Sequence, residues 1–368
     1  MKKERNSNFE LMRIVSMFFI VLFHMIISTG GNLINNTTGL TKMFLEFICM
    51  IIIVHVNSYI LVSGYFQHDK KFSIKKVFSL VGMAWFYKFI IALIMYITKL
   101  HNFTILEIIK ILSPFEYQNN WFLIVYISMY IMSPYINILI ERLSQKEHRK
   151  FLIILFVVFT IIPTITNQST FANTGFSLIH FIYLYIVGSY LKKYPIKENL
   201  HFKNFNDNKK RFIFLMIFIF LGTFNFLMYE FSAHIKTITS SNTINYFADL
   251  LITNLFCYQN PLLIIQSISY FLFFETLNFK NKIINKMAAL IFAVYIIHEN
   301  PFIMKYMYKI LGIATGATHS SIVIVRMFIC TIIVMFSCLL IEFIRTETLS
   351  VIKKLLNKAK NKYCKSNI

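Results

Sequence analysis

Long apolar stretches and short polar segments alternate along this chain of 368 residues. A helix needs about 20 predominantly apolar residues to cross a membrane, and ten stretches approach or exceed that length. The pattern therefore predicts an all-α fold, a polytopic membrane helix bundle with about ten transmembrane helices. We place these helices at residues 9–29, 43–65, 77–98, 121–140, 151–166, 177–191, 212–230, 258–277, 287–310 and 321–344.

Composition and charge support the same class and predict an orientation. Hydrophobic residues make up 57% of the chain and charged residues 14%, against about 25% charged residues in a soluble domain. The net charge of +21 would suggest a nucleic-acid partner for a soluble protein, but here the basic residues gather in alternate loops. With the N-terminus inside, 28 of the 37 lysines and arginines fall in inside segments and 4 in outside loops. Since cytoplasmic loops carry the excess of basic residues, we expect both termini in the cytoplasm and no nucleic-acid partner.

The cysteines and the N-terminus exclude two further features. Five cysteines are scattered, mostly within apolar stretches, and form neither a disulfide framework nor a metal-ligand spacing. The segment from Met1 to Arg5 and the apolar run after it are similar to a signal peptide. That run is too long, however, and lacks a small-residue cleavage site before Gly30. We therefore expect no bound metal and a first helix that stays in the membrane.

Arg13 and His24 lie on one face of the first predicted helix. They are eleven residues apart, close to three turns, so both side chains point the same way with a rise of about 16 Å between them. Arg13 falls near the cytoplasmic edge and His24 in the outer half of the membrane. Arginine suits phosphate binding, and imidazole suits proton transfer near neutral pH. The alternative is that Arg13 snorkels to the surface and His24 makes an interhelix hydrogen bond.

The second predicted helix carries several polar residues and one notable glycine. Each polar residue is a candidate for substrate binding, with interhelix hydrogen bonding as the alternative. They are His55, Asn57, Ser58 and Ser63. Gly64 follows and would permit a close helix approach.

Lys88 and Trp121 are candidates in the third and fourth predicted helices. A charged side chain near the bilayer centre costs about 2.5–3.5 kcal/mol on insertion scales, so Lys88 calls for a function or a buried acidic partner. Trp121 lies at the outer boundary, where an aromatic belt anchor is the default interpretation and substrate binding the alternative. In the sixth helix we expect His180 and Gly188 to serve packing rather than chemistry.

The ninth predicted helix contains His298, Glu299 and Asn300 in succession, followed by Pro301. Proline stops a helix, and irregular backbone at membrane depth is tolerated where it lines a cavity or packs inside the protein. The segment therefore predicts a broken helix beside a cavity, with His298 and Glu299 as candidate catalytic residues. The alternative is a helix end at the membrane surface whose polar groups are simply hydrated.

Several segments together resemble the acyltransferase family 3 membrane acyltransferases. They are Asn8-Phe-Glu10-Leu-Met-Arg13 through His24, Ser63-Gly64-Tyr65-Phe66, Asn120-Trp121-Phe-Leu, Leu184-Tyr185-Ile-Val-Gly188 and Tyr295-Ile-Ile-His298-Glu299-Asn300-Pro301. They span nearly the whole chain in order. The Arg13–His24 pair together with the His-Glu-Asn-Pro run is the most specific part.

The resemblance implies an enzyme, a membrane O-acyltransferase of a bacterial plasma membrane. Such proteins take an acyl group, commonly acetyl, from cytoplasmic acyl-coenzyme A and pass it to a hydroxyl of a cell-surface polysaccharide or a lipid-linked glycan. Membrane lipids would surround it. The resemblance makes Arg13 a candidate ligand of the coenzyme A phosphates. It makes His24 a catalytic residue, either a general base or a relay for the acyl group.

Two departures from the family pattern change these expectations. Many members carry paired arginines after the second helix, where this chain has Lys75 and Lys76 among four lysines. Lysine supplies charge without bidentate geometry, and we expect these two to contact the cofactor. Some members also append an extracytoplasmic esterase-like domain. Here we expect a transmembrane acyltransferase domain at 1–345 and a basic cytoplasmic tail at 346–368, so the acceptor is acylated directly or through a separate extracytoplasmic protein.

Two other functions stay open from the sequence. A transporter or flippase of a lipid-linked saccharide would also be a polytopic bundle with buried charge, but such proteins often contain inverted repeats, and no repeat is visible. A polysaccharide polymerase would need a sizeable external loop, and the predicted outside loops are short. The sequence does not fix which of His24, His55 and His298 transfers protons.

Overall fold

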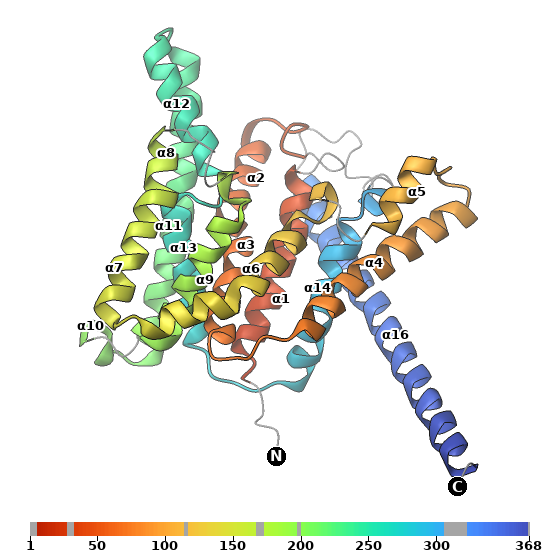
Figure 1. The fold of residues 1–368 in the computed structure, drawn as a ribbon. Coiled ribbons are helices and arrows are strands. Elements are labelled where there is room, and N and C mark those ends of the chain that lie inside the picture. Colours follow the sequence, from red (N-terminus) through yellow and green to blue (C-terminus); the bar gives the residue numbers. More distant parts are fainter. Residues whose placement is uncertain are drawn as a thin grey trace.

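The computed structural model describes residues 6–27, 33–113, 117–166, 173–196, 200–304 and 322–366. Every regular element in these ranges is helical, which confirms the predicted all-α bundle (Figure 1). The last part of the predicted ninth helix, after residue 304, lies outside the described residues, as do residues 28 and 29 of the predicted first helix.

The helices follow the predicted apolar stretches, with several breaks inside them. A π-helical turn, Val157–Ile161, joins α7 to α8, and a 3-10 turn, Asn173–Gly175, precedes α9. The helices are α1 (Asn8–Ile27), α2 (Gly39–Ile52), α3 (His55–Gln67), α4 (Ile74–Ile97), α5 (Ile105–Leu112), α6 (Tyr117–Arg142), α7 (Gln145–Phe156), α8 (Ile162–Thr166), α9 (Leu178–Lys193), α10 (Leu200–Lys203), α11 (Asp207–Ile238), α12 (Asn242–Leu255), α13 (Pro261–Glu275), α14 (Lys282–His298) and α16 (Ile322–Ser366).

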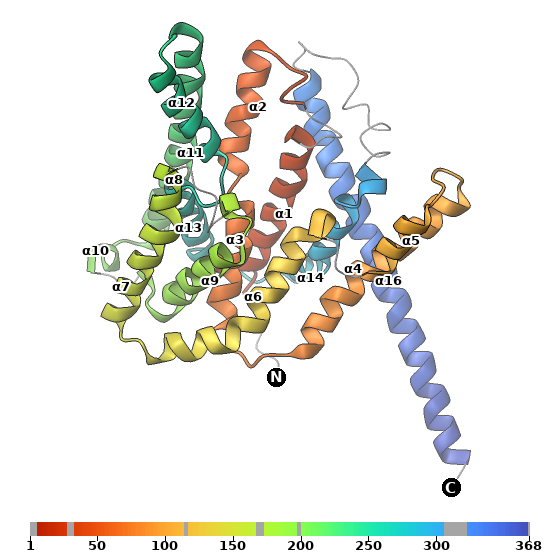
Figure 2. The same cartoon turned by 45° about the horizontal axis from the view of Figure 1, so that its top comes forward.

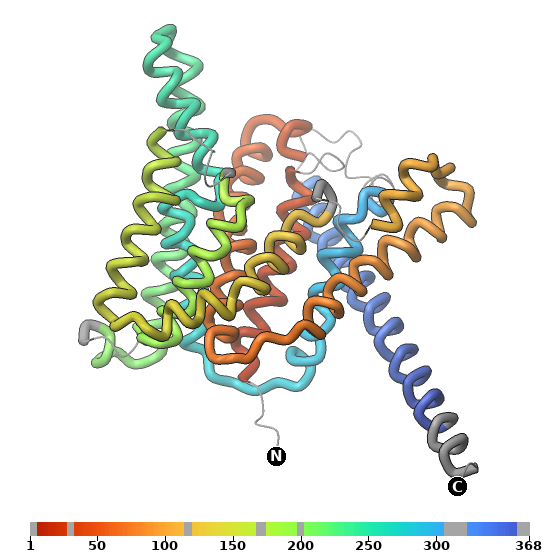
Figure 3. The backbone as a smooth tube through the Cα atoms, in the orientation of Figure 1, coloured from red at the N-terminus to blue at the C-terminus, as the bar shows by residue number. Residues whose placement is uncertain are grey.

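Seven helical segments in the described ranges are long and apolar enough to cross a membrane, where the sequence predicted ten. The predicted spans at 177–191, 258–277 and 287–310 correspond to α9, α13 and α14. These helices have 16, 15 and 17 residues, fewer than the roughly 20 of a full crossing. Figure 3 shows that α1 starts and α16 ends on the same side of the bundle, as an even number of crossings requires. The count of ten and the cytoplasmic position of that side stay predictions.

The first helix lies inside the bundle. α1 packs against α2, α3, α13, α14 and α16 (Figure 1). Apolar side chains around it, among them Met12, Val21 and Met25, are fully buried. This central position places α1 side chains beside α14, which lies far away in the sequence.

A close crossing joins α3 to α9 through two glycines. A Cβ atom on Gly64 would lie 2.1 Å from the Tyr185 carbonyl oxygen, and one on Gly188 would lie 2.3 Å from the Leu61 carbonyl oxygen. Neither position has room for a side chain, because the facing atoms belong to the backbone. The prediction that Gly64 permits close approach is confirmed, and Gly188 serves packing as expected.

Two parts of the chain reach away from the bundle. α4 and α5 lean outward, and the C-terminal part of α16 extends beyond the other helices (Figures 1 and 2). Large apolar side chains such as Phe78 and Phe89 are exposed on α4, and Ile329 is exposed near the start of α16, as expected for surfaces in contact with lipid. α16 continues as one helix through residue 345, where the sequence predicted the boundary between the membrane domain and the tail.

Three breaks in the helices shape the interior. The predicted second span separates into α2 and α3 at Ile53 and Val54. α6 is kinked at Asn120, where φ is −140° and ψ is 35°. α14 ends at His298, and helical structure resumes at Pro301, which confirms the predicted broken helix.

Candidate active site

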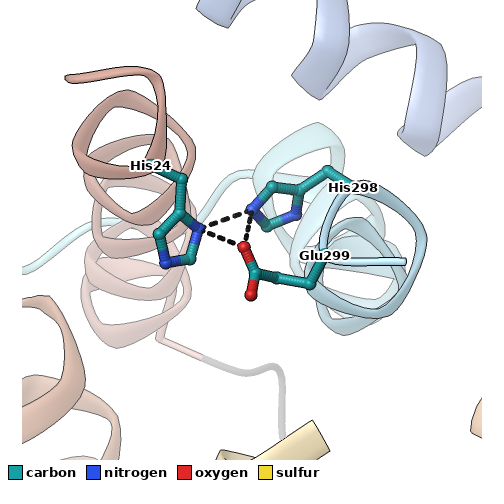
Figure 4. A group of neighbouring side chains, drawn as sticks. All are labelled: His24, His298 and Glu299. Atoms are coloured by element: carbon teal, nitrogen blue, oxygen red, sulfur yellow. Dashed lines mark hydrogen bonds and ion pairs between the residues drawn. The ribbon is translucent and has the colours of Figure 1, made fainter. Parts of the chain in front are cut away.

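His24, His298 and Glu299 form one cluster between α1 and the end of α14 (Figure 4). His24 Nδ1 lies 3.0 Å from His298 Nε2 and 2.7 Å from Glu299 Oε1. His298 Nε2 lies 3.7 Å from the same carboxylate oxygen. His298 is fully buried, whereas the side chains of His24 and Glu299 are 21% and 18% exposed. The structure thus brings together the three residues that the sequence offered as catalytic.

The backbone of α14 determines which nitrogen of His298 carries a proton. His298 Nδ1 lies 2.6 Å from the Val294 carbonyl oxygen, one turn earlier in the helix. A carbonyl oxygen only accepts hydrogen bonds, so Nδ1 is the donor and Nε2 of the neutral ring is an acceptor. His24 Nδ1 must then donate the hydrogen bond between the two rings. Neutral His24 is left with an unprotonated Nε2, which is the form that a general base needs.

Glu299 is the C-cap residue of α14 and completes the cluster. Adjacent helical residues point about 100° apart, and the His24 ring sits where it contacts both His298 and Glu299. The carboxylate therefore lies beside the imidazole that would gain a proton during catalysis. A negative group in this place orients the ring and stabilises its positive charge, as in known catalytic triads.

A cavity of about 200 Å³ opens beside His24. One wall follows α1 from Met17 to Ile27, a rise of about 15 Å. His55 from α3 and Tyr258 line it as well. Most of the remaining lining is aromatic: Tyr59, Trp121, Phe122, Phe176, Phe292 and Tyr295. The cluster therefore borders a largely apolar chamber through His24.

Trp121 lines this chamber, and the belt anchor that its position in the sequence favoured stays a prediction. Its ring centroid lies 4.5 Å from that of Phe176 and 6.3 Å from that of Tyr258. The kink at Asn120 precedes it and redirects the start of α6. Trp121 therefore belongs with the candidate substrate-binding residues.

His55 lines the chamber through a fixed hydrogen-bond chain. Its Nδ1 donates to the Ile52 carbonyl oxygen at 2.8 Å, at the end of α2. Its Nε2 is therefore an acceptor, and the Tyr258 hydroxyl donates to it at 3.2 Å. Both ring nitrogens of His55 are committed, so this ring holds Tyr258 in place.

The other polar residues of α3 make structural hydrogen bonds. Asn57 Nδ2 donates to the Tyr258 carbonyl oxygen at 3.0 Å, and Asn57 Oδ1 lies 3.0 Å from His180 Nε2. Ser58 and Ser63 bond back along α3, to the carbonyl oxygens of Val54 at 2.7 Å and Tyr59 at 2.9 Å. Asn57 therefore makes the interhelix hydrogen bonds that were its alternative, whereas the bonds of Ser58 and Ser63 run back along their own helix, and His180 serves packing as expected.

A cationic group lies beyond the Met17 end of the chamber. Lys76 Nζ is 3.4 Å from the Tyr126 hydroxyl and 4.2 Å from the Tyr130 ring centroid. Tyr126 stacks on the chamber residue Phe122 with ring centroids 5.9 Å apart, and Arg13, one turn before Met17, forms a 3.1 Å ion pair with Glu10. The Arg13 carbonyl oxygen accepts a 2.7 Å hydrogen bond from Tyr59, a chamber residue. The structure therefore links Arg13 and Lys76 to the chamber, while Lys75 is exposed beside them and its role stays a prediction.

A second cavity, of about 220 Å³, contains Lys88 and is more polar. Lys88 Nζ donates to the carbonyl oxygens of Lys110 and Ser113. Glu107, Asn120 and Asn300 also line this cavity. Hydrogen bonds from the backbone and hydroxyl of Thr104 hold the pKa of Glu107 below its usual value, so this carboxylate is ionised at neutral pH. Asn300 follows Glu299 directly, so the second cavity adjoins the cluster.

Sequence reasoning did not single out two tyrosines of the chamber. Tyr258 lies in the polar segment that blurred the start of the eighth predicted helix, and Tyr295 belongs to the ninth helix, one turn before His298. The spacing of Tyr295 from His298 was the available signal. Tyr258 had none, because its position depends on the fold.

The three clustered residues also form a group that could hold a metal ion, since their ligand atoms lie within 4.8 Å of one another. Zinc bound at about 2.0–2.1 Å would keep tetrahedral ligand atoms about 3.3 Å apart. The contacts of 2.7 and 3.0 Å to His24 Nδ1 are shorter than this, and the 3.0 Å contact to His298 Nε2 is a hydrogen bond. We expect elemental analysis of the purified protein to find no stoichiometric zinc and chelators to leave activity unchanged. Loss of activity that zinc restores would contradict this expectation.

Comparison with known protein families agrees with the geometry. A family described as an acyltransferase domain matches residues 6–343, nearly the whole chain. The matched segment includes the cluster, both cavities and the cationic group. Comparison with curated proteins and with solved structures gives no match. The chain therefore belongs to the acyltransferase 3 family and is a multi-pass membrane acyltransferase.

Proposed function

We propose that this protein transfers an acetyl group from cytoplasmic acetyl-coenzyme A to a hydroxyl of a cell-surface or extracellular polysaccharide. The observation that carries the proposal is the His24–His298–Glu299 cluster beside a chamber whose residue Tyr59 donates to the Arg13 carbonyl oxygen. A base at a chamber and cationic groups beyond it, such as Arg13 and Lys76, suit transfer from an acyl-coenzyme A.

In the proposed reaction His24 Nε2 is the general base. It takes the proton of the acceptor hydroxyl as the hydroxyl oxygen forms a bond to the thioester carbonyl carbon. The tetrahedral intermediate then expels the coenzyme A sulfur, which takes the proton from His24. Glu299, 2.7 Å from His24 Nδ1, and His298 hold the ring in the tautomer that this cycle uses.

The chamber has the length needed for the donor. Arg13 and His24 are separated by about 16 Å along α1. The phosphopantetheine arm of coenzyme A is a flexible chain of comparable length. With its phosphates at Arg13 and Lys76, the arm would run along α1 and present the thioester to His24. Its apolar surroundings, such as Ile20 and Phe23, suit a thin, mostly uncharged chain.

The second cavity is the candidate entry for the acceptor. It carries the amides of Asn120 and Asn300, the carboxylate of Glu107, the cations of Lys88 and Lys110, and the ring of Phe302. Amides, charges and one aromatic face together suit a hydroxyl-rich saccharide. The acceptor would therefore approach the cluster from the side of Asn300 and the donor from the side of Met17. A lipid-linked glycan or a separate acyl-carrying protein could deliver or receive the group there.

The test compares glycans from wild-type and deletion strains. We expect the deletion to lower the mass of one glycan by one acetyl unit per modified residue, and the purified protein to move label from acetyl-coenzyme A to that glycan. Loss of the whole polymer would instead support a transporter or a polymerase.

Lys76 provides a separate test of the donor site. Replacing Lys76 by alanine should raise the KM for acetyl-coenzyme A about tenfold, equivalent to about 1.4 kcal/mol, with kcat nearly unchanged, since a phosphate contact far from the thioester contributes equally to ground and transition states. Steady-state kinetics with varied donor measures this. The control is Lys146→Ala, which removes an exposed lysine at the start of α7. An unchanged KM in Lys76→Ala, or an equal rise in the control, would exclude this site.

A further inference from the structure

The chamber contains three tyrosines, and their hydroxyl protons differ in what they bond to. Tyr59 donates to the Arg13 carbonyl oxygen at 2.7 Å. Tyr258 donates to His55 Nε2 at 3.2 Å. The third, Tyr295, has a hydroxyl proton with no acceptor among the described residues.

The unpaired hydroxyl proton of Tyr295 lowers the stability of the folded protein. Tyr295 is only 5% exposed, and a buried hydroxyl without a partner costs roughly 1–3 kcal/mol. Such a group in a native structure calls for an explanation, and a ligand that completes its hydrogen bonding is one. The backbone N–H of Phe122 approaches the hydroxyl oxygen, so it is the hydroxyl proton that has no acceptor among the described residues.

Tyr295 is also aligned with the catalytic cluster. It precedes His298 by three residues on α14, so the two lie one turn apart on neighbouring parts of the same helix surface. Their ring centroids are 6.4 Å apart. The Tyr295 ring packs against those of Phe122 at 5.7 Å and Phe292 at 5.9 Å, which leaves the ring little freedom. The chamber therefore holds a fixed hydrogen-bond donor that packs near His298 and shares the lining with His24.

We infer that Tyr295 is a catalytic residue that donates a hydrogen bond to the thioester carbonyl oxygen as that oxygen becomes negatively charged. The inference rests on the proposed acyl transfer. When the acceptor oxygen bonds to the carbonyl carbon, the carbonyl π electrons move to its oxygen, and the Tyr295 O–H stabilises that oxyanion. When the C–S bond breaks, the electrons return and the carbonyl of the new ester forms. The tyrosine keeps its proton throughout, while His24 carries the proton from the hydroxyl to the leaving sulfur.

The experiment replaces Tyr295 by phenylalanine, which removes one oxygen atom and, among the described residues, only the approach of the Phe122 N–H. Removal of one oxyanion donor lowers kcat about 10²–10³-fold, so we expect a loss of that size with nearly unchanged KM and with unchanged binding of acetyl-coenzyme A. The matched control is Tyr183→Phe, a buried tyrosine on α9 outside both cavities, which should keep wild-type kcat. Size-exclusion profiles and thermal midpoints of both variants establish that they fold.

Each outcome separates this inference from the function on which it rests. An inactive wild-type protein, with every candidate donor and acceptor tested, would overturn the proposed function. An active wild type with a Tyr295→Phe variant within threefold of its kcat would overturn the role of Tyr295 alone. A Tyr295→Phe variant that loses donor binding in proportion to its activity would also overturn it, because the hydroxyl would then act in the ground state.

Discussion

Replacing His24 by alanine should lower the rate of acyl transfer about 10³-fold, the middle of the range that general-base catalysis contributes. The loss follows from the geometry of the ring. His24 Nδ1 is held by His298 and Glu299, so Nε2 is the unprotonated nitrogen available to the acceptor hydroxyl. Single-turnover measurements with labelled acetyl-coenzyme A would isolate the chemical step from binding and release.

The control for this variant is His234→Ala, which removes an exposed histidine at the far end of α11 and should leave the rate unchanged. Glu299→Gln offers an intermediate case, since it keeps the shape of the side chain and removes the negative charge beside His24. We expect its rate between those of His24→Ala and wild type. A His24→Ala variant with the wild-type rate would show that another group abstracts the proton.

Replacing Gly64 by alanine should destabilise the protein by about 3 kcal/mol, the upper end of the usual cost of overpacking. The new Cβ would lie 2.1 Å from the Tyr185 carbonyl oxygen, and backbone atoms cannot rotate away as a flexible side chain can. α3 and α9 would have to separate, which would disturb His55 and the interhelix hydrogen bond between Asn57 and His180. Thermal unfolding of the detergent-solubilised protein measures the effect.

Gly82 supplies the matched control. It lies inside α4, and a Cβ there would meet nothing within 4 Å. Because alanine favours a helix over glycine, Gly82→Ala should stabilise the protein by about 0.5–1 kcal/mol. Equal thermal midpoints for the two variants would mean that the α3–α9 contact does not limit stability.

The sequence predicted those features that depend on one helix at a time. The apolar stretches gave the helices, and the 3.6-residue period placed Arg13 and His24 on one face of α1. The run from His298 to Pro301 predicted a break, because proline and adjacent polar groups do not continue a membrane helix. The family resemblance then assigned these local signals to one class of enzyme, the membrane acyltransferases, and the family comparison confirms that class.

Features that depend on contacts between helices could not be predicted in this way. Nothing in the sequence pairs His24 with His298, because the two belong to separate periodic patterns. Trp121 fitted a belt anchor by its position, and only the kink at Asn120 turns it into the chamber. Apolar length alone also overstated α13 and α14, because Asn260 caps the start of α13 and Glu299 caps the end of α14 inside the predicted spans.

The cluster joins residues 274 positions apart in the chain, which has a consequence for biosynthesis. α1 is synthesised first and α14 near the end, so the base gains its two partners only after most of the helices have inserted. Under the proposed function, a nascent chain would hold its donor-binding residues before it holds a competent base. The active site would then become complete only when α14 is in place, and an unfinished chain would not hydrolyse the thioester of its donor.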